Sequence, residues 1–151
     1  MMINHIISIL VVLCLLSFTA VTTSDDLNKL YSKDYDGFWE HWERIKNEAV
    51  SCDDPQKTSL YFSNALETLG NAEVSEANGE VIENLALKNP ECLLRGLEGK
   101  PIENQRKFIK FFLIHPIFNE PSLIEKSLNQ IWSKQICLNL KKVYYSVKRA
   151  N

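Results

Sequence analysis

The sequence lacks the short motifs that mark the common catalytic and nucleotide-binding sites. Its 151 residues include only five glycines, which are scattered, and they form no GxSxG, Walker or GxGxxG pattern. HExxH, CxxC and paired Cys/His spacings, the usual ligand sets of zinc sites, are also missing. These absences argue against nucleophilic, nucleotide-dependent and metal-assisted catalysis, so we expect no enzyme activity, no catalytic residue, no metal site and no cofactor.

Long hydrophobic runs are equally scarce. The one uninterrupted stretch, IISILVVLCLLSF at residues 6–18, is shorter than the roughly 20 apolar residues that a membrane span needs. Small and polar residues follow it, which is typical of a signal peptide, although no Lys or Arg precedes it. We therefore expect residues 1–24 to be a cleaved signal peptide. Residues 25–151 would then form one secreted domain, periplasmic in a bacterium and otherwise extracellular, with no stable membrane insertion.

Charge is nearly balanced overall but is unevenly distributed. The formal net charge is −2, yet residues 25–103 carry a net charge of −9 and residues 104–151 a net charge of +7. The two halves could neutralise each other in the fold, or each could present a field that steers a charged partner; ordinary solvated faces are the simpler explanation. The basic half lacks interleaved aromatic and arginine residues, so we expect no nucleic-acid partner.

Apolar residues recur at helical spacing through most of the chain, and no long stretch alternates with the period of a strand. Pro55, Pro90 and Pro101 stand where a first helical turn would begin. The predicted helices cover residues 34–50, 55–69, 73–88, 91–97, 101–115 and 122–148. The sequence thus predicts a single all-α domain of about six helices.

Short helices joined at proline corners are typical of helical-repeat hairpins. The segments PECLLRGL at residues 90–97 and PSLIEKSL at residues 121–128 place apolar residues similarly, 31 residues apart. HEAT-like right-angled hairpins and an irregular helical bundle are therefore the two architectures that we expect.

Three cysteines remain after removal of the predicted signal peptide. Cys52 follows one predicted helix and Cys92 begins another, so a disulfide between them would join two corners of the fold; closing a loop of this length contributes about 4 kcal/mol. Cys137 lies between apolar neighbours in the last predicted helix and is interpreted as a small buried residue. We favour the Cys52–Cys92 pair over the other pairings, over the reduced state, and over a nucleophilic Cys92, for which no supporting histidine is evident.

The segment WEHWER at residues 39–44 places His41 between Glu40 and Glu43. General acid–base catalysis would require a carboxylate and the imidazole to converge in a cleft. On a helix, however, these side chains form an ordinary solvated charge cluster, which is the interpretation that we favour. The neighbouring Trp39 and Trp42 form an aromatic stripe that would belong to the core or to an interface.

Glutamates recur along the predicted helix 73–88, on the side away from its apolar positions. We predict that Glu73, Glu76, Glu80 and Glu83 form a partner-binding face that steers a basic protein toward the chain. By elimination, the sequence predicts a non-enzymatic protein that binds another protein, most concretely an immunity or inhibitor protein against a toxin or hydrolase. The alternatives are a structural or assembly factor of the cell envelope, which self-associates through the aromatic stripe, and an unrecognised hydrolase.

Overall fold

The computed structural model describes residues 24–151, and all regular secondary structure in this range is helical. The elements are α2 (Ser24–Lys33), α3 (Tyr35–Val50), α4 (Pro55–Glu67), α5 (Ala72–Lys88), α6 (Pro90–Glu98), α7 (Ile102–Phe108), the π-helix η1 (Ile109–Ile114), α8 (Pro121–Ser133) and α9 (Leu138–Ala150). The predicted all-α class is confirmed. The predicted signal peptide lies outside the described residues except for its last residue, and within the described range no helix has the length and apolarity of a membrane span.

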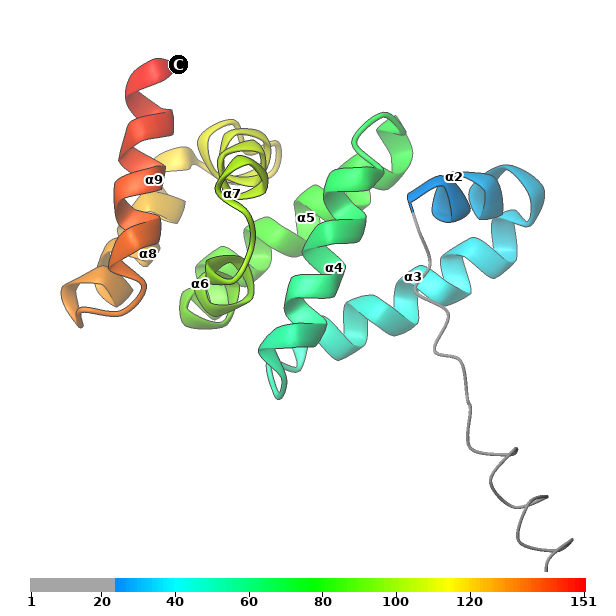
Figure 1. The fold of residues 1–151 in the computed structure, drawn as a ribbon, viewed down its shortest axis with the longest axis horizontal. Helices are drawn as coiled ribbons and strands as arrows, with labels where there is room; N and C mark the ends of the chain where they lie inside the picture. Colours follow the sequence, from blue (N-terminus) through cyan, green and yellow to red (C-terminus); the bar gives the residue numbers. More distant parts are fainter. Residues whose placement is uncertain (1–23) are drawn as a thin grey trace, which may run out of the picture.

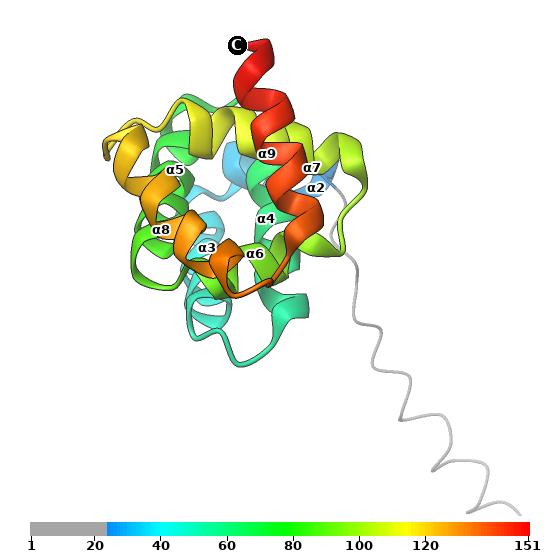
Figure 2. The same ribbon diagram turned by 90° about the vertical axis from the view of Figure 1, so that its left-hand side faces the viewer.

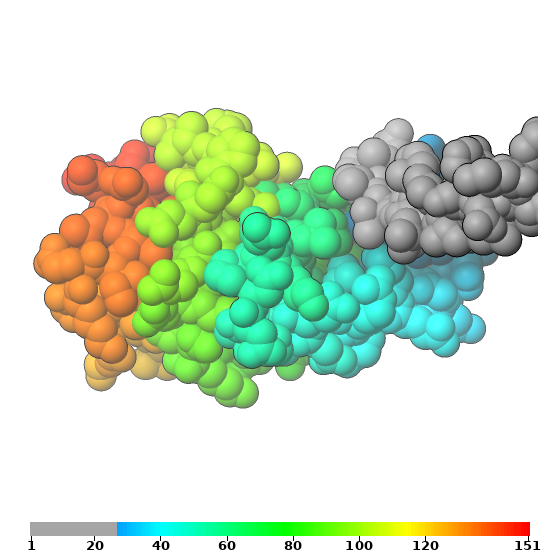
Figure 3. All heavy atoms as spheres, turned by 60° about the horizontal axis from the view of Figure 1, so that its bottom comes forward, coloured from blue at the N-terminus to red at the C-terminus, as the bar shows by residue number. Residues whose placement is uncertain are grey.

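The helices follow one another in chain order along the longest axis of the molecule, with α2 and α3 at one end and α8 and α9 at the other (Figure 1). Figure 2 looks along this axis and places α8 and α9 in front of the earlier helices. The same order is visible on the surface, where the colours pass from blue and cyan to orange (Figure 3). Neighbours in space include α4 with α3 and α6, α5 with α6 and α8, and α7 with α9.

Short polar residues determine where three of the helices begin. Side-chain oxygens of Asp54, Asn71 and Asn89 accept hydrogen bonds from backbone N–H groups in the first turns of α4, α5 and α6. Pro55 and Pro90 occupy the first position of α4 and α6, directly after two of these caps. The helix starts predicted at these corners are therefore confirmed to within one residue.

The single helix predicted over residues 122–148 is wrong. The structure contains two helices, α8 and α9, because Gln135 and Cys137 between them have φ angles of 65° and 52°. A left-handed backbone conformation cannot continue a right-handed helix. Cys137 consequently precedes α9 instead of lying inside a helix, although it is buried as predicted, with 7% of its surface exposed.

Two other elements differ from the prediction. Helix α2 was not predicted; with it and the division into α8 and α9, the described range contains eight α-helices in place of about six. The predicted helix over residues 101–115 is α-helical only as far as Phe108 and then continues as η1. The wider π-helical turn leaves Phe111 48% exposed while Phe112 and Leu113 are buried.

Aromatic side chains connect successive helices through the main core. The Phe108 ring lies 4.5 Å from the Phe62 ring and 5.1 Å from the Phe112 ring, centroid to centroid, which joins α4 to α7 and η1. Trp132 packs against Tyr144 at 5.3 Å and so joins α8 to α9. Burial of these large rings supplies much of the hydrophobic stabilisation of the C-terminal half.

A disulfide joins the corner between α3 and α4 to the first turn of α6. The Cys52 and Cys92 sulfur atoms are bonded, with the two Cα atoms 5.7 Å apart, as predicted. Cys137 is the free cysteine of the described range. Close by, α4 and α6 approach so tightly that a Cβ atom on Gly96 would lie 2.6 Å from Thr58 Cγ2.

Candidate functional site

The four glutamates predicted as one partner-binding face do not share one surface. Glu76 and Glu80 are exposed on α5, as predicted. Glu73 is exposed but already holds two hydrogen bonds, and Glu83 is completely buried. The placement of Glu83 on the exposed side was wrong, because the helix faces the loop between η1 and α8 at this position.

Glu73 ties the N-terminal helices to α5. The Tyr35 hydroxyl donates a hydrogen bond to Glu73 Oε1 at 2.6 Å, and the Tyr31 hydroxyl donates one to Glu73 Oε2. These hydrogen bonds lower the pKa of the Glu73 carboxyl and raise the pKa of both tyrosines. Since both of its oxygens are engaged within the chain, Glu73 contributes to the fold more directly than to a binding surface.

Glu83 holds the loop formed by residues 115–120. Its Oε1 accepts a hydrogen bond from the backbone N–H of Ile117 at 2.6 Å, and its Oε2 accepts from the N–H groups of Phe118 and Asn119 at 2.9 and 2.8 Å. The Asn119 side chain adds a fourth hydrogen bond at 3.1 Å. A buried carboxylate requires such partners, and here three consecutive backbone N–H groups supply them.

The loop lies over α5 at Gly79, where an added Cβ would make only ordinary contacts. A Cβ atom at Gly79 would have Phe118 Cε2 at 3.6 Å and Ile117 Cδ1 at 3.9 Å as its nearest loop neighbours. Even so, Ile117 is 68% exposed and Phe118 43% exposed. Leu123, in the first turn of α8, is 50% exposed. The loop therefore exposes apolar side chains to solvent, while hydrogen bonds to Glu83 hold its backbone against α5.

An open groove of about 540 Å³ lies between α3 and α5. Trp42, Val81 and Leu85 supply its apolar lining, and Glu80 and Lys88 are among the charged residues that line it. Another lining residue, Lys46, lies 5.2 Å from the centre of the Trp42 ring and pairs with Glu43. Because Glu80 belongs to this lining, the groove and the exposed acidic side of α5 are adjacent.

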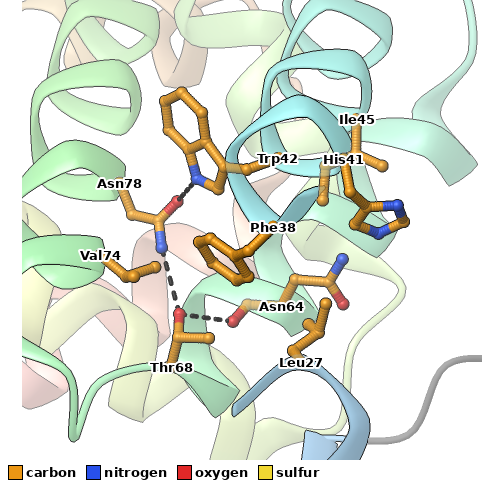
Figure 4. A pocket seen from close by; sticks show the side chains of 9 residues that line it. All are labelled: Leu27, Phe38, His41, Trp42, Ile45, Asn64, Thr68, Val74 and Asn78. Atoms are coloured by element: carbon orange, nitrogen blue, oxygen red, sulfur yellow. Dashed lines mark hydrogen bonds between the residues drawn. The ribbon is translucent and has the colours of Figure 1, made fainter. Parts of the chain in front are cut away.

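A buried polar network fixes the orientation of Trp42 beside this groove (Figure 4). Asn78 Oδ1 accepts hydrogen bonds from Trp42 Nε1 at 2.9 Å and from the Tyr61 hydroxyl at 2.8 Å. Asn78 Nδ2 in turn donates to Thr68 Oγ1 at 3.2 Å. Trp42 is half-buried and packs against the core, so the aromatic stripe is at least partly core.

His41 does not form an acid–base pair with its glutamate neighbours. Its Nδ1 lies 3.0 Å from Arg44 Nη2, and among the described residues no carboxylate is hydrogen-bonded to its ring. Burial and the charge of Arg44 lower the pKa of His41. Figure 4 shows the imidazole at the edge of a small pocket that Leu27 and Asn64 also line. WEHWER was interpreted as an ordinary solvated charge cluster; Glu43 and Arg44 are exposed as that requires, whereas His41 is partly buried.

The basic half of the chain has a groove of its own. It measures about 340 Å³ and lies between the α7–η1 segment and α9, with Arg106, Lys107, Lys110 and Phe111 among its lining residues. Every ion pair found within residues 27–151 joins two residues of the same half. Mutual neutralisation of the halves by direct ion pairs is therefore not seen in the described part of the chain. Among the described residues, no group of three or more His, Cys, Asp or Glu side chains is placed so that it could hold a metal ion.

Two of these features, the Asn78 network and the loop held by Glu83, were not predicted from the sequence. A retrospective signal exists for the second one, since Gly79 and Glu83 are four residues apart and thus share one side of α5. No protein-family model, curated protein or solved structure matches the chain. The surfaces of α5 and its surroundings are therefore the basis for a functional proposal.

Proposed function

We propose that the chain is an exported, non-enzymatic protein that binds a cationic protein partner through the exposed side of α5, in the manner of an immunity or inhibitor protein. The observation that carries this proposal is the open groove of about 540 Å³ beside Glu76 and Glu80. Neither glutamate takes part in the ion pairs found in the described range. Both carboxylates can therefore pair with a partner without breaking a contact of the fold.

The charge distribution supports a cationic partner. Residues 25–103, which carry a net charge of −9, include the helices α3 to α6 around the groove, whereas the basic residues 104–151 form the other end of the molecule (Figure 1). Separated fields of this kind accelerate encounter with an oppositely charged protein and oppose encounter with a like-charged one. The acidic end would thus set both the rate and the orientation of docking.

The disulfide supports an exported location. A Cys52–Cys92 bond joins two helix corners, and disulfides of this structural kind persist in oxidising compartments such as the periplasm or the extracellular space. A bond across 40 residues also constrains the unfolded chain, which is valuable for a small protein outside the cell. The Cys52–Cys92 disulfide is therefore consistent with the proposed export.

The test is a pull-down from a native extract of the exporting compartment, with the oxidised protein as bait and elution by a salt step. We expect one stoichiometric basic protein that the wild-type bait retains and the Glu76→Lys/Glu80→Lys bait does not. An Asp53→Lys/Glu103→Lys bait is the matched control, because it makes the same charge change at exposed positions away from α5. Equal retention by all three baits would contradict the proposed binding surface.

Self-association is a second candidate function, which the opposite charge of the two ends favours. An acidic end that meets the basic end of another copy is a head-to-tail contact, which forms rings or open filaments. This candidate predicts oligomers at micromolar concentration and low salt that dissociate at high salt, measured by analytical ultracentrifugation. A monomer under both conditions would exclude it.

A further inference from the structure

The loop of residues 115–120 combines a fixed backbone with exposed apolar side chains. The buried carboxylate of Glu83 accepts from the N–H groups of Ile117, Phe118 and Asn119, so these three residues have one defined backbone conformation. Removing a carboxylate from water is unfavourable unless hydrogen bonds compensate, and here all four bonds go to the loop. The Glu83 carboxylate thus fixes the position of a surface loop.

Three large apolar side chains in and next to this loop, called the apolar tip, are exposed. Ile117 is 68% exposed, Leu123 is 50% exposed, and Phe118 is 43% exposed although its ring lies near α5 at Gly79. Large apolar side chains on a backbone of defined conformation are typical of interface anchors, since less conformational entropy is lost when they bind.

Charge around the tip identifies the kind of surface that it fits. Glu76 lies one turn before Gly79 on the same side of α5, and Glu120 ends the loop; both are exposed. Residues 111–125 contain neither lysine nor arginine. An apolar tip with an acidic rim complements an apolar site with a basic rim, and it is repelled by the anionic headgroups of a membrane surface.

We infer that Ile117, Phe118 and Leu123 are the apolar anchor of the interface, and that they insert into an apolar site of the cationic partner while Glu76 and Glu120 pair with its basic rim. This inference rests on the proposed function and specifies which element of the surface makes the central contact. Glu83 acts as a positioning residue, because it sets the orientation of the anchor without touching the partner.

The experiment uses the oxidised, ¹⁵N-labelled protein and a synthetic 18-residue helical peptide of leucine and lysine, with the leucines on one face. We expect the backbone amide signals of residues 117–119 and 76–83 to shift in NMR titrations. We further expect the Ile117→Ser/Phe118→Ser variant to bind the peptide about tenfold more weakly or worse. Leu60→Ser/Ile102→Ser is the matched control, because both side chains are 54% exposed and lie on other helices; its affinity should equal that of the wild type.

The possible failures separate the two proposals. If the peptide binds and shifts only groove residues, with equal affinity for wild type and Ile117→Ser/Phe118→Ser, the loop is not the anchor and a cationic partner still stands. If the leucine–lysine peptide does not bind, or if a leucine–glutamate peptide binds with equal affinity, the proposed cationic partner is wrong. The proposed anchor is then wrong too, because it rests on that partner. Stronger binding to vesicles of phosphatidylserine than to the peptide would overturn the inference in favour of a membrane surface.

Discussion

Glu83 and Asn119 are joined by two hydrogen bonds, from the backbone N–H and from the side-chain Nδ2 of Asn119 to Glu83 Oε2, at 2.8 and 3.1 Å. Glu83→Ala removes the acceptor of these bonds and of two further loop N–H groups. Leaving these part-buried donors without their acceptor costs about 1–3 kcal/mol, so we expect a loss of that size in the free energy of unfolding. Urea unfolding followed by circular dichroism measures it.

The same substitution should release the loop before the rest of the fold. We expect faster hydrogen exchange at the amides of Ile117, Phe118 and Asn119 and unchanged exchange in α4 and α6. Glu80→Ala, an exposed position on the same helix, is the control and should alter neither stability nor exchange. Uniformly faster exchange over the whole chain would show that Glu83 supports the global fold and does not specifically hold the loop.

Gly96 provides a test of the close packing between α4 and α6. A Cβ atom there would lie 2.6 Å from Thr58 Cγ2 and 3.1 Å from Phe62 Cε2, so Gly96→Ala should destabilise the protein by about 1–3 kcal/mol through overpacking. Gly99→Ala is the control, since nothing lies within 4 Å of its added Cβ. Adding Thr58→Ser removes the clashing methyl and should restore part of the stability; no recovery would contradict the proposed contact.

Removal of the disulfide should cost much of the stability. Cys52→Ser/Cys92→Ser releases a constraint across 40 residues, and we expect the free energy of unfolding to fall by about 2–5 kcal/mol. Treatment of the wild type with a reductant should have a similar effect and should leave the Cys52→Ser/Cys92→Ser variant unchanged. If reductant lowers the stability of the variant equally, the effect does not come from this bond.

Cys137 should react slowly with alkylating agents until the pH is high. Burial and the neighbouring Glu98 carboxylate raise the pKa of its thiol to about 11. The folded chain therefore holds this proton more tightly than the unfolded chain, so the contribution to stability is present at neutral pH and is lost as the pH rises toward 11. Because the thiolate is the reactive form, alkylation followed by mass spectrometry should accelerate about tenfold per pH unit between pH 8 and pH 10. A reaction that is already rapid at pH 8 and does not accelerate toward pH 10 would contradict this environment of Cys137.

Local signals account for the part of the fold that could be predicted from the sequence. Helical periodicity together with Asp54–Pro55 and Asn89–Pro90 defined the starts of α4 and α6, because capping and proline geometry act within one turn. The Cys52–Cys92 pair was also predictable, since both residues lie at helix corners. The break before α9 was not, because Gln135 and Cys137 adopt positive φ angles without the glycine that normally signals them.

The candidate site was harder to predict because burial is decided by tertiary contacts. Glu76, Glu80 and Glu83 follow the same helical spacing, and only the arrival of residues 117–119 buries the last of them. Asn78 likewise becomes the centre of a polar network only once Trp42 and Tyr61 converge on it from α3 and α4. For Asn78 the sequence of α5 holds no signal, and for Glu83 the spacing of Gly79 and Glu83 is a signal only in retrospect.

The central claim is that the exposed acidic side of α5, with its adjacent loop, binds a cationic partner. The most direct measurement is the dissociation constant of the leucine–lysine peptide, by isothermal titration calorimetry, for three proteins of matched helicity. We expect Glu76→Lys/Glu80→Lys to weaken binding about tenfold or more, and Asp53→Lys/Glu103→Lys to change it little. Equal affinities for the wild type and the Glu76→Lys/Glu80→Lys variant would contradict the account.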